Sequence, residues 1–228
     1  MLGPRAISYK FRGVIPKIDD YNQALALAKG LLSGKNPHRV ARVSGAAIGR
    51  EQEGSLFFSL CFLNQQTRIS WPGLRVSSET TGEDLSPQQQ ILVLHYLFGA
   101  WDSSGAEPSG EWISFQEVPD GRFYLDAFQR RAKNPLVQSF GEMPERMVKH
   151  AAQAYSAQLL DQGDASVLVR AFPLVYVALI LWRGDEEFQP EGNILFDRNI
   201  IQILSAEDIA WLAGMIVYPL IGMARESH

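Results

Sequence analysis

Cysteine and histidine are scarce in this sequence. Among 228 residues there is one cysteine, Cys61, and there are four histidines. A single thiol excludes a disulfide within the chain and any iron–sulfur or zinc site built from several of its own thiolates. The histidines are scattered and form no ligand-spaced pair, which argues against a histidine-rich metal centre. The sequence therefore predicts neither a bound metal nor a cofactor.

Long apolar runs and the common catalytic loops are also missing. The longest nearly unbroken apolar run, residues 171–182, is about half of the roughly 20 residues that a bilayer requires, and its β-branched and aromatic residues favour a buried strand. No glycine-rich phosphate loop and no G-x-S-x-G motif occurs. The first residues contain no apolar core of a signal peptide. We expect a cytoplasmic protein without membrane contact.

The charge of the chain is divided unevenly. The net charge is -4, but residues 1–50 carry +7 and the remaining residues carry -11. Such a division is typical of a polyanion-binding face, or of two oppositely charged parts that pack together. The basic residues are spread singly among apolar ones, which favours the second interpretation and argues against a nucleic-acid partner.

Helices and strands are indicated by periodicity and capping residues. Helices are predicted over residues 19–34, 86–100, 122–132, 144–160 and 205–224, the third ending before Pro135 and the last kinked or ended by Pro219. Strands are predicted within residues 38–49, 54–64, 67–77, 111–118, 165–175, 175–182 and 193–196.

The order of these elements predicts the fold class. Strands come in runs and do not alternate strictly with helices, so the fold should be α+β, a largely antiparallel sheet with about five helices packed mainly on one face. The polar segment at residues 102–111 is the only plausible linker, but its length suits a surface loop. A single domain over residues 1–228 is expected.

Four segments in this order carry a family resemblance: "ILVLHYLFGA", "GEWISFQEVPDGRFYLDAF", "FPLVYVALILWRGDEEFQPEGNILFD" and "AEDIAWLAG". From about Ile91 to Gly214 the chain resembles the bacterial and archaeal family called domain of unknown function 3786. The resemblance implies an uncharacterised cytoplasmic protein of an anaerobe. Some members carry an added iron–sulfur module of four cysteines, which this chain lacks. A fold and a cellular setting are implied, but no reaction.

An acidic hairpin is expected at residues 182–197, directly after the apolar run. Trp182 should end a buried strand, with exposed carboxylates following at Asp185, Glu186 and Glu187 and a further one at Asp197. These oxygens could hold Mg²⁺ or Ca²⁺, although the spacing of a calcium-binding helix–loop–helix is absent. They could equally be a solvated turn whose charges protect the sheet edge.

A basic segment, residues 122–133, has the opposite charge. It carries Arg122, Arg130, Arg131 and Lys133 against Asp126, with aromatic residues interleaved. Arginine suits carboxylates and phosphates, so an anionic small molecule could bind here. The alternative is that the basic segment pairs with the acidic hairpin.

His95 is the remaining candidate. It lies among apolar residues of a predicted helix, where a buried histidine bonded to backbone is common, and a general base is the alternative. We expect a binding or accessory protein that holds an anionic small molecule, or the cofactor domain of a redox partner, between the basic segment and the acidic hairpin. The alternatives are a divalent-metal hydrolase or transferase that uses the hairpin with His95, and a scaffold without a small ligand.

Overall fold

A computed structural model describes the backbone of residues 18–226 and the side chains from Asp20 onward. Its α-helices are α1 (Ile18–Leu32), α2 (Pro37–Ser44), α3 (Pro87–Asp102), α4 (Gly121–Phe128), α5 (Asn134–Phe140), α6 (Pro144–Tyr155) and α7 (Ala206–Glu226). Its strands are β1 (Ala47–Arg50), β2 (Leu56–Phe62), β3 (Gln65–Trp71), β4 (Val76–Ser78), β5 (Trp112–Ser114), β6 (Gln158–Leu159), β7 (Ala165–Phe172), β8 (Val175–Trp182) and β9 (Glu191–Asp197). The shorter helical turns are η1 (Phe115–Glu117), η2 (Gln129–Lys133) and η3 (Arg198–Gln202).

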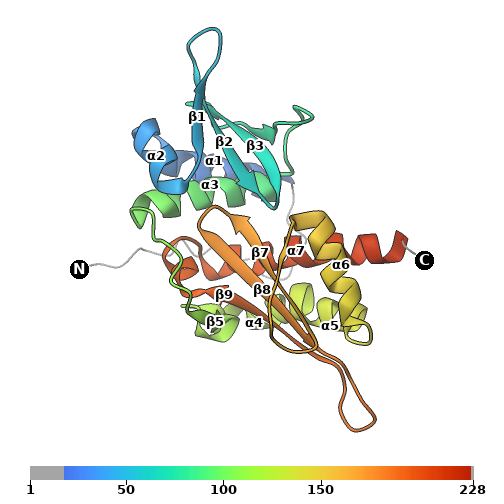
Figure 1. The fold of residues 1–228 in the computed structure, drawn as a ribbon. Helices are drawn as coiled ribbons and strands as arrows, with labels where there is room; N and C mark the ends of the chain where they lie inside the picture. The colour runs from blue at the N-terminus through green and yellow to red at the C-terminus, as the bar shows by residue number, and fades with distance from the viewer. Residues whose placement is uncertain (1–17, 227–228) are drawn as a thin grey trace.

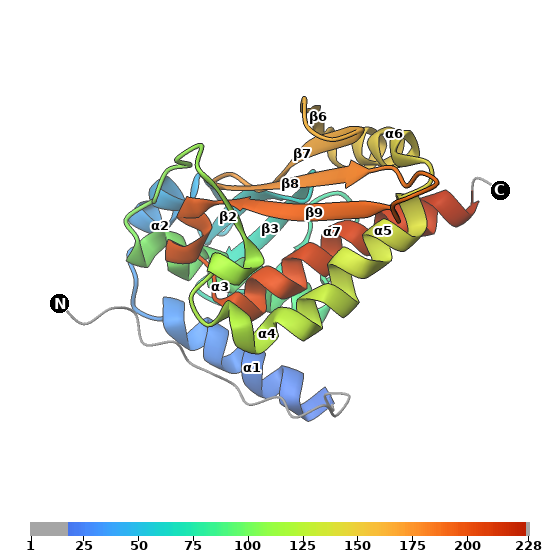
Figure 2. The same cartoon turned by 90° about the horizontal axis from the view of Figure 1, so that it is seen from below.

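The strands form two antiparallel sheets. The first has the order β1-β2-β3-β4, and the second has the order β5-β9-β8-β7-β6. In Figure 1 the four-stranded sheet lies beside α1, α2 and α3, and in Figure 2 α4, α5 and α7 lie on one face of the five-stranded sheet. The α+β class with antiparallel pairing is confirmed, and the strands divide between two sheets where one was expected.

One continuous hydrophobic core serves both sheets. Phe172 of β7 stacks on Phe62 of β2 with ring centroids 4.7 Å apart and on Tyr96 of α3 at 4.2 Å. The Tyr96 hydroxyl donates a 2.6 Å hydrogen bond to the Ser44 carbonyl, so the buried phenol is satisfied. These rings join the helices of the first half to the strands of the second.

The capping signals in the sequence are confirmed. Ser86 caps α3 in a reciprocal arrangement with Gln89, and Pro87 occupies the first turn. Ser205 donates a 2.7 Å hydrogen bond to the Asp208 carboxylate, and the Asp208 backbone N–H donates to the Ser205 hydroxyl at 3.2 Å. Both helices therefore begin where the sequence predicts.

The strand predicted within residues 38–49 is wrong in its first half. Asn36 accepts a hydrogen bond from the Arg39 backbone N–H at 3.1 Å, and Gly45 ends the helix in the left-handed conformation, φ +70°. Val40, Ala41 and Ser44 form one buried face. The Asn-Pro start and the Gly end make α2, and only β1 remains extended.

Neither interior proline ends its helix. The helix predicted to close before Pro135 runs on through the wider π turn η2 into α5. Proline lacks an N–H and crowds the carbonyl four residues earlier, and the wider turn accommodates both effects. Pro219 lies inside α7, where the Tyr155 hydroxyl donates to the Ile216 carbonyl at 2.9 Å and approaches the Met215 carbonyl at 3.4 Å. Tyr155 thus bonds carbonyls in the turn that Pro219 disturbs.

One further helix end differs from the prediction. The helix predicted over 144–160 ends at Tyr155, because Ser156 adopts the left-handed conformation, φ +49°, and the chain turns into β6.

The helix α7 is long and apolar enough to cross a bilayer, but 61% of its apolar stretch is buried inside the protein. Its apolar residues therefore serve the core.

Candidate functional site

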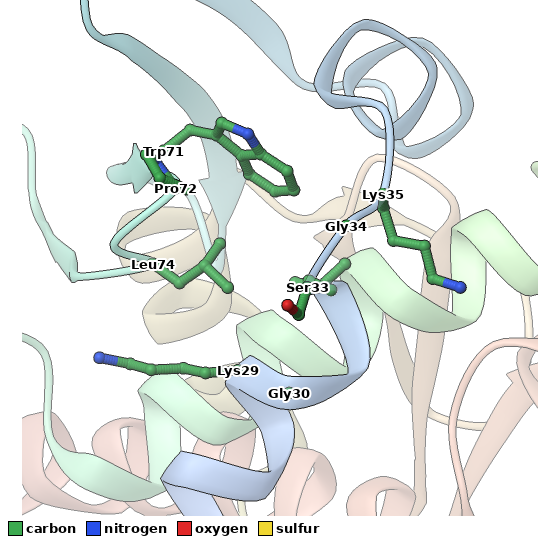
Figure 3. A pocket seen from close by; sticks show the side chains of 9 residues that line it. Lys29, Gly30, Ser33, Gly34, Lys35, Trp71, Pro72 and Leu74 are labelled. Atoms are coloured by element: carbon green, nitrogen blue, oxygen red, sulfur yellow. The ribbon is translucent and has the colours of Figure 1, made fainter.

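A pocket of about 490 Å³ opens between the C-terminal end of α1 and the turn that joins β3 to β4 (Figure 3). Its residues are of three kinds: the basic Lys29 and Lys35, the apolar Leu32, Trp71, Pro72 and Leu74, and the small Gly30, Ser33 and Gly34. This volume lies within the range of roughly 300–1,000 Å³ that small-molecule sites occupy. No local pattern predicted a site here, because its two walls are about 40 residues apart along the chain.

Local backbone conformation builds both walls. Gly34 has φ +70°, which lets the chain leave α1 sharply after Leu32. On the opposite wall Leu74 has φ +52°, and its backbone N–H donates to the Ser70 carbonyl at 2.8 Å. The Ser70 hydroxyl accepts the Arg75 backbone N–H at 3.0 Å and closes the turn. The β3–β4 wall is therefore held in place by hydrogen bonds of the chain itself.

The pocket is electropositive. None of its nine lining residues, all in the described part of the chain, is acidic. Lys35 lies 5.5 Å from the centroid of the Trp101 ring and 5.9 Å from that of Phe98, and Arg39 lies 4.2 Å from the centroid of Trp101. The two lysines outweigh the partial negative charge of about half an electron at the end of α1. An anion is therefore the favoured occupant.

Apolar surface completes the pocket. Leu32 and Leu74 line it and are buried, while Trp71 is half-buried and extends toward the end of α1 (Figure 3). The Trp71 ring packs on Phe58 with centroids 5.3 Å apart. Two cations beside an indole and two leucines suit an anion that also has an apolar body.

The turn of the acidic hairpin lies elsewhere, between the end of β8 and the start of β9, and projects from the body in Figure 1. Trp182 ends β8 and is 40% exposed, and Asp185, Glu186 and Glu187 are all exposed, so that part of the prediction is confirmed. The Asp185 carboxylate accepts the backbone N–H of Glu187 at 2.8 Å and of Phe188 at 2.7 Å. Its role in the structure is to close the hairpin turn.

Asp197 does not join the other carboxylates. In the β8–β9 register Trp182 pairs with Glu191 and Val177 pairs with Phe196, so Asp197 lies at the opposite end of the strands. It is buried and accepts hydrogen bonds from Ser109, Gly110 and Asn199. The expectation that the hairpin would bring Asp197 to the acidic turn is wrong, because Asp197 is the last of the seven extended residues of β9 and the turn precedes the first.

The basic segment runs along α4 and η2. Arg122, Arg130 and Arg131 are exposed and Lys133 is half-buried. Arg130 pairs with Asp126 at 2.9 Å, whereas Arg183 of the acidic hairpin pairs with Glu145 of α6 at 2.7 Å. Within residues 20–226 no ion pair joins the basic segment to Asp185, Glu186 or Glu187. The predicted charge pairing of the two segments is therefore not present.

His95 is half-buried and bonds a carboxylate, so the expectation of a buried histidine bonded to backbone is wrong. Its Nδ1 lies 2.8 Å from a carboxylate oxygen of Asp208, which also bonds Ser205 at the start of α7. Burial by itself lowers the pKa of His95, but the charge and hydrogen bond of Asp208, with the charge of Glu207, outweigh it and raise the pKa. The two residues are 113 positions apart in the sequence, and no local pattern connects them.

Glu207 makes this cluster sensitive to pH. Burial, then the neighbouring charge of Asp208, raises the pKa of Glu207 to about 7. The Tyr124 hydroxyl lies 3.5 Å from the Glu207 carboxylate, and Tyr124 comes from the basic segment. The cluster therefore links α3, α4 and α7 through a carboxyl group with a pKa of about 7 and a histidine with a raised pKa.

We expect the protein to lose stability as the pH rises through this range. Folding raises the pKa values of Glu207 and His95, so their protonated forms stabilise the fold fully at low pH. That contribution is lost from about pH 4.5 to 7 for Glu207 and near and above pH 6.5 for His95. Glu207→Gln should raise the free energy of unfolding at pH 8 by about 1–2 kcal/mol after solvent screening, and by only about a quarter of that amount at pH 5.

Urea unfolding at pH 5 and pH 8 measures this difference. The matched control is Glu186→Gln, at an exposed position of the acidic hairpin. This substitution should change the free energy of unfolding by the same small amount at both pH values. An equal effect of both substitutions at pH 8 would contradict a special role for Glu207.

A family model matches residues 36–218 of the chain, and its description is Domain of unknown function (DUF3786). The chain belongs to this family. No curated protein and no solved structure matches it. The matched region contains the β3–β4 turn, His95, the basic segment and the acidic hairpin, whereas Lys29 and Lys35 of the pocket precede it.

Proposed function

We propose that this member of the DUF3786 family is a binding protein for an anionic small molecule, and that the pocket between α1 and the β3–β4 turn holds it. The observation that carries the proposal is a pocket with two lysines, an indole and no acidic lining residue. The net charge of the whole chain is -4, so a positive pocket is a local property of its residues.

The same class of ligand was expected between the basic segment and the acidic hairpin. No ion pair joins these segments in the described residues. We place the anion in the pocket instead, because its lining combines two lysines with apolar side chains. The family resemblance supports a cytoplasmic accessory role in anaerobic metabolism as part of the proposal. The metal-dependent alternative has less support, because Asp197 lies at the far end of β9 from the acidic turn.

A second candidate is the docking of a redox or cofactor-carrying partner on the basic segment. Phe123 is 84% exposed and is flanked by the exposed Arg122. A protruding aromatic ring beside arginine is a common anchor of protein interfaces. This candidate concerns a different face of the molecule and is compatible with an anion in the pocket.

The proposal predicts anion binding that depends on the two lysines. We expect at least one of inorganic phosphate, citrate and 2-naphthoate to raise the melting temperature saturably, because a ligand at 100 times its Kd adds about 2.7 kcal/mol. In the double variant Lys29→Gln, Lys35→Gln the affinity should fall about tenfold, since two partly exposed ion pairs contribute about 1–2 kcal/mol.

The matched control is Lys149→Gln, which removes an exposed lysine of α6 outside the pocket. Its affinity should equal that of the unmodified protein in isothermal titration. Two results would overturn the proposal: no binding by any of the three anions, or binding that the double variant and the control retain equally.

A further inference from the structure

We infer that the anion is a planar aromatic acid whose ring stacks on the Trp71 indole and whose acid group pairs with Lys29. This inference rests on the proposed function and adds the class of ligand. Three features of the pocket support it: the position of the indole, the open space at the glycines near the end of α1, and the different surroundings of the two lysines.

The indole is held rigidly by the sheet. Trp71 is the last residue of β3 and pairs with Leu56 of β2. Its ring packs against Phe58 at a 41° interplanar angle, and Phe58 is fully buried. Figure 3 shows the indole directed toward Ser33 and Gly34 at the end of α1. An aromatic surface that is already fixed in place stacks with a ring at little entropic cost.

The opposite wall has room for a flat ring. Gly30 presents no side chain, and a Cβ built on it would have no atom within 4 Å. The same is true of Gly34. Carbon atoms in van der Waals contact are about 3.5–4.0 Å apart, so a slot beside a bare helix backbone suits a thin, planar group. The pocket volume of about 490 Å³ accommodates a two-ring acid.

The two lysines have different surroundings. Lys35 already lies over the Phe98 and Trp101 rings. Lys29 has no ion pair and no ring contact within residues 20–226, and its ammonium lies on the Trp71 and Leu74 side of the pocket (Figure 3). We therefore assign the acid group to Lys29, and expect Lys29→Gln to weaken binding more than Lys35→Gln.

The experiment compares ligands that differ in one property each. Isothermal titration uses 2-naphthoate, its saturated analogue decahydro-2-naphthoate, the neutral 2-naphthamide, and inorganic phosphate. We expect 2-naphthoate to bind about three- to tenfold more tightly than the saturated acid, since aromatic pairs add about 0.5–1.5 kcal/mol beyond buried area. The ratio of the affinity for 2-naphthoate to that for the saturated acid should persist in Trp71→Phe. It should fall to about one in Trp71→Leu.

A further variant keeps the test independent of the stability of Trp71→Leu. Gly30→Leu leaves the indole and both lysines in place and fills the slot from the helix side, and leucine favours the helix over glycine. This variant should retain the fold, as measured by circular dichroism. Its affinity for 2-naphthoate should fall at least tenfold.

The outcomes separate the inference from the proposed function. If phosphate or the saturated acid binds as tightly as 2-naphthoate, the aromatic ligand is wrong while anion binding stands. Binding of 2-naphthamide equal to that of 2-naphthoate would overturn the role of Lys29. If none of the anions binds, both the inference and the proposed function fail.

Discussion

Gly99→Ala is expected to lower the free energy of unfolding by about 3 kcal/mol, at the upper end of the usual cost of overpacking. A Cβ at Gly99 would lie 1.8 Å from the carbonyl oxygen of Ile203 and 2.6 Å from its carbonyl carbon. Both atoms are backbone, so no side chain can rotate away. The contact holds α3 against the segment that leads into α7.

That segment has little freedom to move. The Ile203 and Leu204 backbone N–H groups both donate to the Ile200 carbonyl, at 3.0 and 2.8 Å. Ser205 and Asp208, which start α7, follow directly, and Asp208 bonds His95 on the same helix as Gly99. A shift at Gly99 should therefore also disturb the His95–Asp208 pair.

Urea denaturation of Gly99→Ala and Gly222→Ala measures this effect against a matched control. Gly222 also lies inside a helix, α7, but a Cβ there would have no atom within 4 Å. Alanine should stabilise that position by up to about 1 kcal/mol through helix propensity alone. A loss below about 0.5 kcal/mol at Gly99 would mean that α3 and Ile203 do not approach so closely.

Local signals predicted much of the fold. The Ser86–Gln89 and Ser205–Asp208 caps and the apolar run of β8 were recognisable because each depends on residues within a few positions. The errors at Pro135 and Ser156 arose where one residue decides the outcome. A π turn absorbed the proline, and a left-handed serine ended α6, and neither has a reliable sequence pattern.

The candidate site was less predictable than the fold. The pocket joins α1 to a turn about 40 residues later. The excess of positive charge in residues 1–50 was interpreted as packing between oppositely charged parts, and the anion was expected at the basic segment instead. Residue type alone could not show that His95 would meet Asp208 from another helix. Both sites depend on tertiary contacts between segments, which periodicity and spacing do not encode.

Asp197→Asn is expected to cost about 3 kcal/mol of unfolding free energy. The buried carboxylate accepts four hydrogen bonds: from Ser109 N–H at 2.9 Å, Ser109 Oγ at 3.0 Å, Gly110 N–H at 2.7 Å and Asn199 N–H at 3.1 Å. Burial by itself raises the pKa of Asp197, but these donors outweigh it and lower the pKa. An amide would turn an N–H₂ toward donors and leave at least one of them unsatisfied.

Asp185→Asn is the matched control, because Asp185 also accepts two backbone N–H groups but lies on the exposed turn of the acidic hairpin. Water can replace those bonds, so its cost should stay within about 0.5 kcal/mol. Because folding lowers the pKa of Asp197, its contribution is present above about pH 4 and is lost as the pH falls through the folded value. In urea denaturation, the difference in free energy of unfolding between the two variants should therefore be smaller at pH 3 than at pH 7. Equal losses at pH 7, together with Mg²⁺ binding abolished by either substitution, would instead place Asp197 and Asp185 in one metal site despite their positions at opposite ends of β9.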